Sequence, residues 1–318
     1  VQVAPIVDTQ TIRVNIGRTV KTISFVSPTP DSTIQIFRGD IAGAQDVLPV
    51  LTLGAKKKIA FSVDGVLAVA ESLRAKAFTI RWSGGPSTVI TFSQPGSAVK
   101  YKYGQIQVKV IKGAMEVTNT LALRDEYLWG ISEVPSSWPA AALEAQAIAS
   151  RSYAMSKLGR INSACDCQVY SHIADQNFVG FSKESEPRFG HLWKAAVTRT
   201  IIDTSTSLAI ISNAKPIQAY FFSSSGGATQ TTLDAWGQAT SYTQSVLDPA
   251  GLDPKNNPRF ATWSASADQA LVAKAFLLAD IVTLEIMSRN TAGAVTYIKG
   301  TASDGSTKLL RGDTFRSR

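Results

Sequence analysis

The chain has 318 residues, enough for one large domain or two modest ones. Its composition, 44% hydrophobic and 18% charged, is that of an ordinary globular protein with a buried core. The net charge of +8 suits an acidic partner, such as an anionic polymer, an anionic lipid or nucleic acid. Its positive residues are scattered, with Lys56–Lys58 as a run, and no nucleic-acid-binding motif is present, so we do not expect nucleic acid as the partner. No apolar stretch reaches the roughly 18 residues of a transmembrane helix, and no signal peptide is recognisable at Val1.

Residues 1–98 are predicted to be β. Polar and apolar residues alternate at 11–16, 33–36 and 78–81, a pattern typical of half-buried strands. Nothing in this stretch has catalytic spacing. We therefore expect residues 1–100 to be a β-rich accessory region with a structural or binding role, followed by a mixed α+β core at 101–318. The boundary is soft, because another alternating run, 106–110, lies just beyond it.

The most informative stretch is Tyr127–Gly159. An apolar and aromatic lead-in brings the chain to one carboxylate, Glu133. Val134 precedes Pro135 and is pushed towards an extended conformation. Glu133 is therefore predicted to lie outside a helix.

A long Ala-rich helix follows the carboxylate. Its start is predicted near Pro139, because proline suits the first helical position, with Ser137 as a plausible cap. Residues 140–157 are almost all good or tolerable helix formers, and Gly159 is the natural stop.

Two opposing effects decide whether Glu133 can act as an acid near neutral pH. A nearby helix N-terminus favours the charged carboxylate by roughly 0.3–1 kcal/mol. Desolvation against Trp129 and Trp138 would oppose it, since full burial raises a carboxyl pKa by up to about 3–5 units. If the indoles cover Glu133, desolvation dominates and the residue becomes a usable general acid or base. The alternative is an exposed loop glutamate.

The two cysteines, Cys165 and Cys167, are separated by one residue. A disulfide across so short a span is strained. A metal site would recruit His172, and Asp166 with it, because thiolate and imidazole suit zinc. The spacing is not a standard zinc pattern, so we expect two cysteines packed or bridged in a loop, with zinc as the alternative.

The remainder of the chain is predicted as a polar loop followed by mixed elements. The loop, 162–188, is long enough to be functional. The following elements are a helix at 192–200, strands at 201–211 and 216–223, a Ser-Gly-Gly turn at 223–227, a loop at 241–258, a helix within 265–279 and strands from 281 onwards.

Several other chemistries lack their motifs. A serine hydrolase would carry G-x-S-x-G, which is absent. S-x-x-K occurs at Ser97 and Ser212, without the S-D-N or K-T-G that normally accompanies it. There is no H-E-x-x-H for a zinc peptidase and no glycine-rich phosphate loop.

Residues 101–318 resemble the SpoIID/LytB family of bacterial cell-wall proteins in an ordered set of motifs. These are YLWG at 127–130, EVP at 133–135, Trp138, ALEAQAIASRSYA at 142–154, CQVY at 167–170, WKAAV at 193–197, AYFFSSSGGAT at 219–229, Trp236, and GDTFRS at 312–317, which resembles the last strand of the family.

The resemblance implies cleavage of the peptidoglycan glycan strand by a lytic transglycosylase. Glu133 would be a single general acid/base, unlike the carboxylate pair of a usual glycosidase. No second acid stands in a motif here, and Asp234, near the Ser-Gly-Gly turn, is the nearest substitute. The alternative is a non-catalytic wall-binding protein that enhances an N-acetylmuramoyl-L-alanine amidase. A third alternative is a general polyanion-binding protein that uses the positive charge.

The resemblance also implies a substrate-binding set, an extracytoplasmic location and a connection with sporulation or wall remodelling. For each aromatic side chain in the set, core packing is the alternative. No cofactor is expected apart from the zinc alternative at Cys165, Cys167 and His172, since some relatives carry a metal near this position. The substrate-binding residues are Arg151, Gln146, Ser224, Ser225, Gly226, Gly227, Thr229, Tyr153, Tyr170, Trp138 and Trp236.

Overall fold

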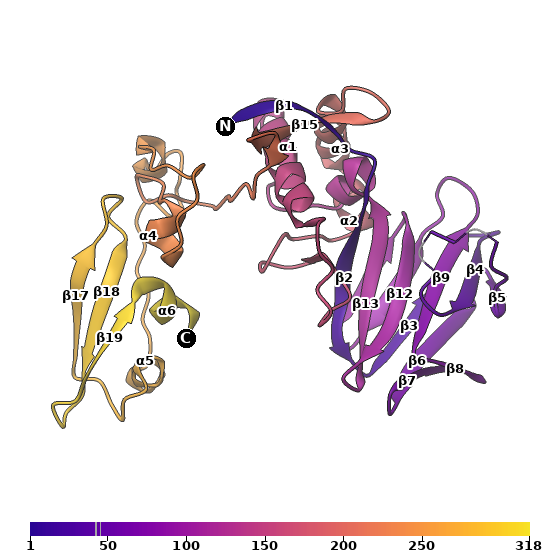
Figure 1. Ribbon diagram of the computed structural model, residues 1–318, viewed down its shortest axis with the longest axis horizontal. Coiled ribbons are helices and arrows are strands. Elements are labelled where there is room, and N and C mark those ends of the chain that lie inside the picture. The colour runs from indigo at the N-terminus through magenta and orange to yellow at the C-terminus, as the bar shows by residue number, and fades with distance from the viewer. Residues whose placement is uncertain (42, 45) are drawn as a thin grey trace. The chain divides into compact units, whose positions relative to one another are not determined.

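The computed structural model describes residues 1–41, 43–44 and 46–318. The chain forms two compact units, Val1–Tyr220 and Phe221–Arg318 (Figure 1). The functional boundary expected near residue 100 lies inside the first unit. The predicted class is confirmed: the protein is α+β and rich in strands.

The first unit is built mainly from antiparallel strands. Their bounds are β1 (Gln2–Val7), β2 (Thr11–Val20), β3 (Thr22–Val26), β4 (Thr33–Arg38), β5 (Leu51–Gly54), β6 (Lys58–Asp64), β7 (Leu67–Ala70), β8 (Leu73–Ala75), β9 (Ala77–Ser83), β10 (Ile90–Gln94), β11 (Ser97–Tyr101), β12 (Gln105–Ile111), β13 (Ala114–Ala122), β14 (Val169–Tyr170), β15 (Thr206–Ser212) and β16 (Lys215–Pro216). One sheet has the order β14-β2-β13-β12-β9-β4-β5 and a second has the order β11-β10-β3-β6-β7-β8. A smaller sheet joins β1, β15 and β16.

The two larger sheets share one hydrophobic core. Phe25 stacks on Phe92 within the six-stranded sheet, with ring centroids 5.3 Å apart. Phe61 of that sheet meets Phe78 of the seven-stranded sheet at 5.4 Å. Strands such as β6 alternate buried and exposed side chains, which is the pattern that the sequence predicts for half-buried strands.

The helical elements of the first unit all follow β13 in the sequence. They are a π-helical turn, η1 (Leu123–Tyr127), and the helices α1 (Ala140–Lys157), α2 (Phe181–Glu184) and α3 (Gly190–Arg199). The helix α1 packs against α3 and β15. Its small residues Ala147 and Ala154 are fully buried in the core of this unit, as is Trp193 of α3.

The start of α1 differs from the prediction in two details. Pro139 is the N-cap residue, with φ −55° and ψ 144°, rather than the first helical residue. No side chain caps the helix, so the predicted cap at Ser137 is wrong. The predicted end of the helix is confirmed, because its last residue, Lys157, lies two positions before Gly159.

The second unit combines short helices with a three-stranded antiparallel sheet. Its elements are α4 (Thr232–Trp236), the 3₁₀ turn η2 (Pro249–Leu252), α5 (Gln269–Phe276), β17 (Thr283–Arg289), β18 (Val295–Thr301), β19 (Thr307–Arg311) and α6 (Gly312–Ser317). A small core gathers Phe276, Ile281 and Leu310, with Phe315 packed against it.

Two predictions of strands are wrong. The stretch predicted as a strand at 216–223 leaves regular structure after Pro216. The closing segment, Gly312–Ser317, is the helix α6 rather than a final strand. Within the described parts of the chain, no helix combines the length and apolarity needed to cross a membrane.

Candidate active site

The segment that carries Glu133 pairs with a second segment from the long loop. Ser132 N donates to the Asn177 carbonyl at 2.8 Å, and Asn177 Nδ2 donates to the Ser132 carbonyl at 2.9 Å. Two residues away on each segment, Val179 N donates to the Gly130 carbonyl at 2.8 Å. Glu133 therefore stands outside a helix, as predicted, on a short paired stretch of backbone.

The Glu133 carboxylate is held from one side by a backbone amide. Asn177 N donates to its Oε1 at 2.7 Å. The following carbonyl, that of Val134, accepts from the ammonium of Lys183 at 2.6 Å, and Lys183 is itself buried. Both ends of this short segment are therefore fixed.

The pKa of Glu133 is raised above its ordinary value by desolvation, because the side chain is partly buried. The hydrogen bond from Asn177 N opposes this, since it favours the ionised form. Burial is the larger effect. The carboxyl group consequently keeps its proton to a higher pH than a free glutamate does, which suits a general acid.

The backbone of the paired segment lies against an aromatic stack. Phe178 stacks on Tyr127 with centroids 5.3 Å apart. A Cβ atom at Gly130 would collide with the Phe178 ring. The glycine of the YLWG motif is therefore required by close packing directly beside Glu133.

The two tryptophans expected to cover Glu133 have different surroundings. The ring of Trp129 lies 3.9 Å from the ammonium of Lys194 and packs against Tyr103, with centroids 5.2 Å apart. Trp138 is 48% exposed. An exposed indole in the segment after Glu133 is available to stack on a sugar ring.

Arg151, which the resemblance assigns to substrate binding, is completely buried at 0% exposure. Its Nε atom lies 3.1 Å from Oδ2 of Asp8, which is equally buried. The remaining guanidinium nitrogens donate to Thr200 Oγ1 at 2.8 Å, to the Leu208 carbonyl at 3.0 Å and to the Arg124 carbonyl at 3.1 Å. In this structure the guanidinium joins four parts of the fold and does not face solvent.

Burial acts on both members of this pair. It lowers the pKa of Arg151 to about 10, against the attraction of Asp8, so the guanidinium stays charged at neutral pH. It also raises the pKa of Asp8, against the attraction of Arg151.

The other predicted residues of α1 and of the loop have identifiable partners. Gln146 donates from Nε2 to Ser150 Oγ, one turn along the same helix, at 3.0 Å. Tyr153 is only 6% exposed, and its hydroxyl donates to Asp175 Oδ1 at 2.7 Å. Tyr170 is partly exposed and stacks on His172, with centroids 5.2 Å apart.

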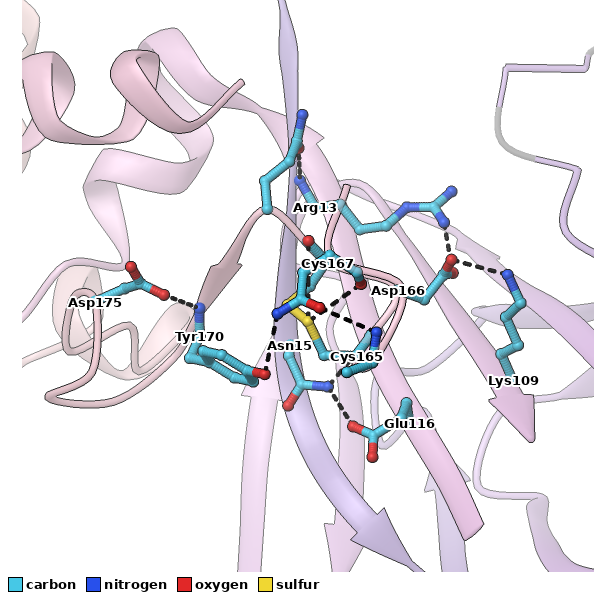
Figure 2. Close-up of a disulfide and its surroundings, with 12 residues drawn as sticks. Arg13, Asn15, Lys109, Glu116, Cys165, Asp166, Cys167, Tyr170 and Asp175 are labelled. Atoms are coloured by element: carbon cyan, nitrogen blue, oxygen red, sulfur yellow. Dashed lines mark hydrogen bonds and ion pairs between the residues drawn. A yellow bond between two sulfur atoms is a disulfide. The ribbon is translucent and has the colours of Figure 1, made fainter. Parts of the chain in front are cut away.

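Cys165 and Cys167 form a disulfide in the loop before β14 (Figure 2). Between them, Asp166 takes a left-handed backbone conformation with φ 53°. Its carboxylate pairs with Arg13 at 2.6 Å and with Lys109 at 2.8 Å. These ion pairs connect the disulfide-bridged turn to β2 and β12 of the seven-stranded sheet.

The disulfide bears on whether Cys165 and Cys167 could bind zinc. Zinc binds thiolates, and here each sulfur is bonded to the other. The Nδ1 atom of His172 accepts from the backbone of Ala174 at 3.2 Å. Among the residues that the structure describes, no three His, Cys, Asp or Glu side chains are placed to hold a metal ion. Cys165, Cys167 and His172 therefore do not fit a zinc site in this structure.

The Ser-Gly-Gly motif belongs to the second unit, and its hydroxyls serve bonds inside that unit. Ser225 Oγ donates to Asp248 Oδ2 at 2.6 Å and accepts from Gly227 N at 3.0 Å. Ser224 Oγ accepts from Asn257 Nδ2 at 2.9 Å. Gly227 has φ 109°, a conformation that favours glycine.

The remaining predicted residues of this unit lie close to the motif in the sequence. Gly226 also has a positive φ, 72°. Thr229 Oγ1 donates to the Gln244 carbonyl at 3.0 Å. Asp234, the substitute acid, is bonded to the N-cap Thr231 of α4 at 2.7 Å, and Trp236 at the end of that helix is 51% exposed.

Several residues that shape the site were not selected from the sequence. Asn177 acts through its backbone, so no side-chain motif points to it. Lys183 and Asp175 lie in the polar loop, whose unusual length was its one signal. Asp8 lies in the N-terminal β region, about 140 residues before its partner, and no local pattern joins the two.

Comparison with known proteins supports the family resemblance. The sequence model of the SpoIID family, described as "Stage II sporulation protein", matches residues 112–206. Stage II sporulation protein D of Bacillus subtilis (strain 168) is 25% identical over 227 residues, which cover 68% of this chain and 62% of that protein. Its namesake in Bacillus amyloliquefaciens is 24% identical over 213 residues, which cover 63% and 57%. Residues 112–206 are thus similar to the SpoIID family, and the two relatives extend the similarity over about two thirds of the chain.

The SpoIID match separates the predicted site residues into two groups. It includes Glu133, the α1 residues and the disulfide loop, and it ends before the Ser-Gly-Gly motif. The aligned part of the chain spans about three fifths of the length of the curated relatives it matches.

Proposed function

We propose that this protein cleaves the peptidoglycan glycan strand as a lytic transglycosylase and acts outside the cytoplasm. Glu133 donates its proton to the glycosidic oxygen as the bond to the sugar C1 breaks. The resulting carboxylate then takes the proton from a hydroxyl of the same sugar. The oxygen of that hydroxyl closes onto C1, which gives an anhydro-sugar end without the participation of water.

One observation carries the proposal. Glu133 combines a pKa raised by burial with a fixed orientation set by Asn177 N. The raised pKa lets the acid hold its proton to a higher pH than a free glutamate does, and the fixed carboxylate can act first as acid and then as base. The family match to residues 112–206 supports a relation to sporulation, since the two relatives are named stage II sporulation protein D.

Exposed aromatic side chains support the glycan-binding part of the proposal. Trp138 is exposed after Glu133, and Tyr170 is partly exposed. Trp236 is exposed in the second unit. Aromatic faces of this kind can stack on sugar rings. In this proposal Arg151 and Tyr153 contribute to the framework that holds the site rather than to direct sugar contact, because both are buried.

The test compares the soluble products that the wild type and Glu133→Gln release from peptide-free glycan strands, measured by mass spectrometry. Glu144→Gln serves as the matched control, because it makes the same chemical change at a glutamate of α1 that pairs with Arg199 on the surface. We expect anhydro-muramic ends from the wild type and the control. Removal of a general acid/base lowers the rate by roughly 10²–10⁴-fold, so we expect Glu133→Gln to release almost none.

Two other results would contradict the proposal. Ordinary reducing ends would indicate hydrolysis and a second carboxylate, with Asp234 the first to examine. No product from folded wild type, together with stimulation of a cell-wall amidase that survives in Glu133→Gln, would establish the amidase-enhancer alternative instead.

A further inference from the structure

Three consecutive residues, Asp175–Asn177, each bond to a different part of the candidate site. The last of them reaches the carboxylate itself, because Asn177 N donates to Glu133 Oε1 at 2.7 Å. This amide is the one that opposes the rise in the pKa of Glu133. Whatever fixes the position of this short segment therefore affects the hydrogen bond that favours the ionised form of Glu133.

The middle residue of the segment fixes it to the aromatic stack. Gln176 is fully buried, and its Oε1 accepts from the Tyr127 hydroxyl at 2.9 Å. This hydroxyl is neutral at physiological pH, because complete burial raises the pKa of Tyr127 well above its ordinary value. The contact is therefore a neutral hydrogen bond inside the core.

The first residue, Asp175, uses both of its carboxylate oxygens. Oδ1 accepts from the Tyr153 hydroxyl of α1 at 2.7 Å, and Oδ2 accepts from Tyr170 N of β14 at 2.8 Å. The second of these bonds is visible in Figure 2. Hydrogen bonds to an ionised group are stronger than neutral ones. Asp175 therefore joins the helix and the strand at the point where the segment begins.

We propose that Asp175 is a positioning residue for Glu133: by joining α1 to β14 it fixes the adjoining backbone, so that Asn177 N meets the Glu133 carboxylate. The inference rests on the role proposed for Glu133. Asp175 does not touch the substrate in this proposal and acts through Asn177.

A purely electrostatic role for Asp175 makes a different prediction. The charged and titratable groups that face Asp175 are Tyr153, Lys157 at 3.8 Å and Tyr127. The phenol of Tyr127 faces Glu133 as well. If Asp175 acted only through its negative charge, its removal would lower the pKa of Glu133 and leave the Asn177 hydrogen bond in place.

The experiment follows the backbone amide of Asn177 by NMR through a pH titration of the full chain. Because this amide donates to Glu133 Oε1, its proton shift should change as Glu133 ionises, and Glu133→Gln should abolish that step. In Asp175→Ala and Tyr153→Phe we expect most of this pH-dependent change in the Asn177 proton shift to disappear. We also expect the Asn177 amide to exchange faster with solvent. The matched control, Asp64→Asn, removes an exposed carboxylate that pairs with Arg74, and it should leave the step unchanged.

Two results would overturn the proposal. If the Asn177 proton shift in Asp175→Ala changed by the full amount but at a lower pH, Asp175 would act through its charge alone. A step unchanged in both variants would mean that the segment is fixed without Asp175. If Asp175→Ala does not fold, Tyr153→Phe decides, because it removes one hydroxyl and keeps the charge of Asp175.

The NMR readout does not depend on turnover, so the two proposals can fail separately. An absence of glycan products together with a lost step would refute the proposed activity and keep the positioning role. Normal products from the wild type, together with an Asn177 titration that is unchanged in the variants, would support the proposed activity and refute the positioning role. If both hold, Asp175→Ala should also release product more slowly, with the pH dependence of the rate displaced from that of the wild type.

Discussion

Glu133 and Arg151 lie in the same stretch of sequence, Tyr127–Gly159, and in the same compact unit, yet their surroundings are opposite. Glu133 is partly buried, and its carboxylate accepts a backbone hydrogen bond from Asn177. Arg151 is fully buried, and its guanidinium contacts four separate segments, including Asp8. The difference shows that burial and partners separate a charged motif residue that holds the fold together from one whose carboxylate is only partly enclosed.

The largest effect that this comparison predicts is on stability at Arg151. Arg151→Ala would leave Asp8 as a buried, uncompensated carboxylate, which typically costs about 3–5 kcal/mol. Chemical denaturation should show a correspondingly lower free energy of unfolding. Arg74→Ala is the control, since its pair with Asp64 is more than half exposed, and it should cost about 0–1 kcal/mol.

A double variant makes the first prediction more specific. Replacing both Arg151 and Asp8 by apolar residues removes the isolated charge, and for a simple buried pair this is often neutral. Here the Leu208 and Arg124 carbonyls would also lose their donor. We therefore expect only partial recovery of stability. If Arg151→Ala lowered the free energy of unfolding no more than Arg74→Ala does, the contrast drawn between Arg151 and Glu133 would not hold.

The second effect concerns the packing beside Glu133. Gly130→Ala places a methyl group against the Phe178 ring, and overpacking of this kind typically costs about 1–3 kcal/mol. Because the paired backbone beside Glu133 must shift, the rate of glycan cleavage should also fall, by up to about 10²-fold. The measurements are chemical denaturation and the rate of product release.

The control for this variant is Gly85→Ala. Gly85 has open space around its Cβ position and lies far from Glu133 in the sequence, so both measurements should stay near those of the wild type. If Gly130→Ala lost stability and kept full activity, the position of the Glu133 backbone would not matter to the reaction.

Much of the fold follows from local patterns in the sequence. Alternation of polar and apolar residues located β2, β4, β9 and β12, and helix propensity located α1 almost to its ends. The segment 216–223 was wrongly predicted as a strand, because an apolar run does not reveal whether a pairing partner exists. The likeness of Gly312–Ser317 to a family strand also gives a wrong prediction, because the segment folds as α6; its residues are mostly weak helix formers, so local propensity does not reveal this helix.

The site was predictable only in part, for a physical reason. Glu133 could be selected because one carboxylate stands in a distinctive motif, but its contact with Asn177 depends on two segments 44 residues apart. The pairing of Arg151 with Asp8 depends on the whole topology of the first unit. The same motif letters that suggest sugar binding at Arg151 therefore give no indication of its burial. Whether Glu133 is the acid of the reaction stays a prediction.

The smallest expected effect is a pH-dependent difference in stability between the wild type and Glu133→Gln. Folding raises the pKa of Glu133 above its ordinary value of 4.5 because burial disfavours the charged form. Well below pH 4.5 the residue is protonated in both states and contributes no pH dependence. As the pH rises through the folded-state pKa, the native carboxyl ionises at a cost that the unfolded chain does not bear, so the wild type loses stability relative to the variant.

Denaturant titrations of the two proteins across this pH window would measure the difference. We expect the free energy of unfolding of Glu133→Gln to increase relative to that of the wild type as the pH rises. This difference should level off once the native carboxyl is fully ionised. Glu144→Gln is the control, because it makes the same chemical change at a glutamate near the surface of α1. A difference that moved in the wild type's favour with rising pH would mean that the hydrogen bond from Asn177 outweighs burial, and Glu133 would then be a poor acid and a better base.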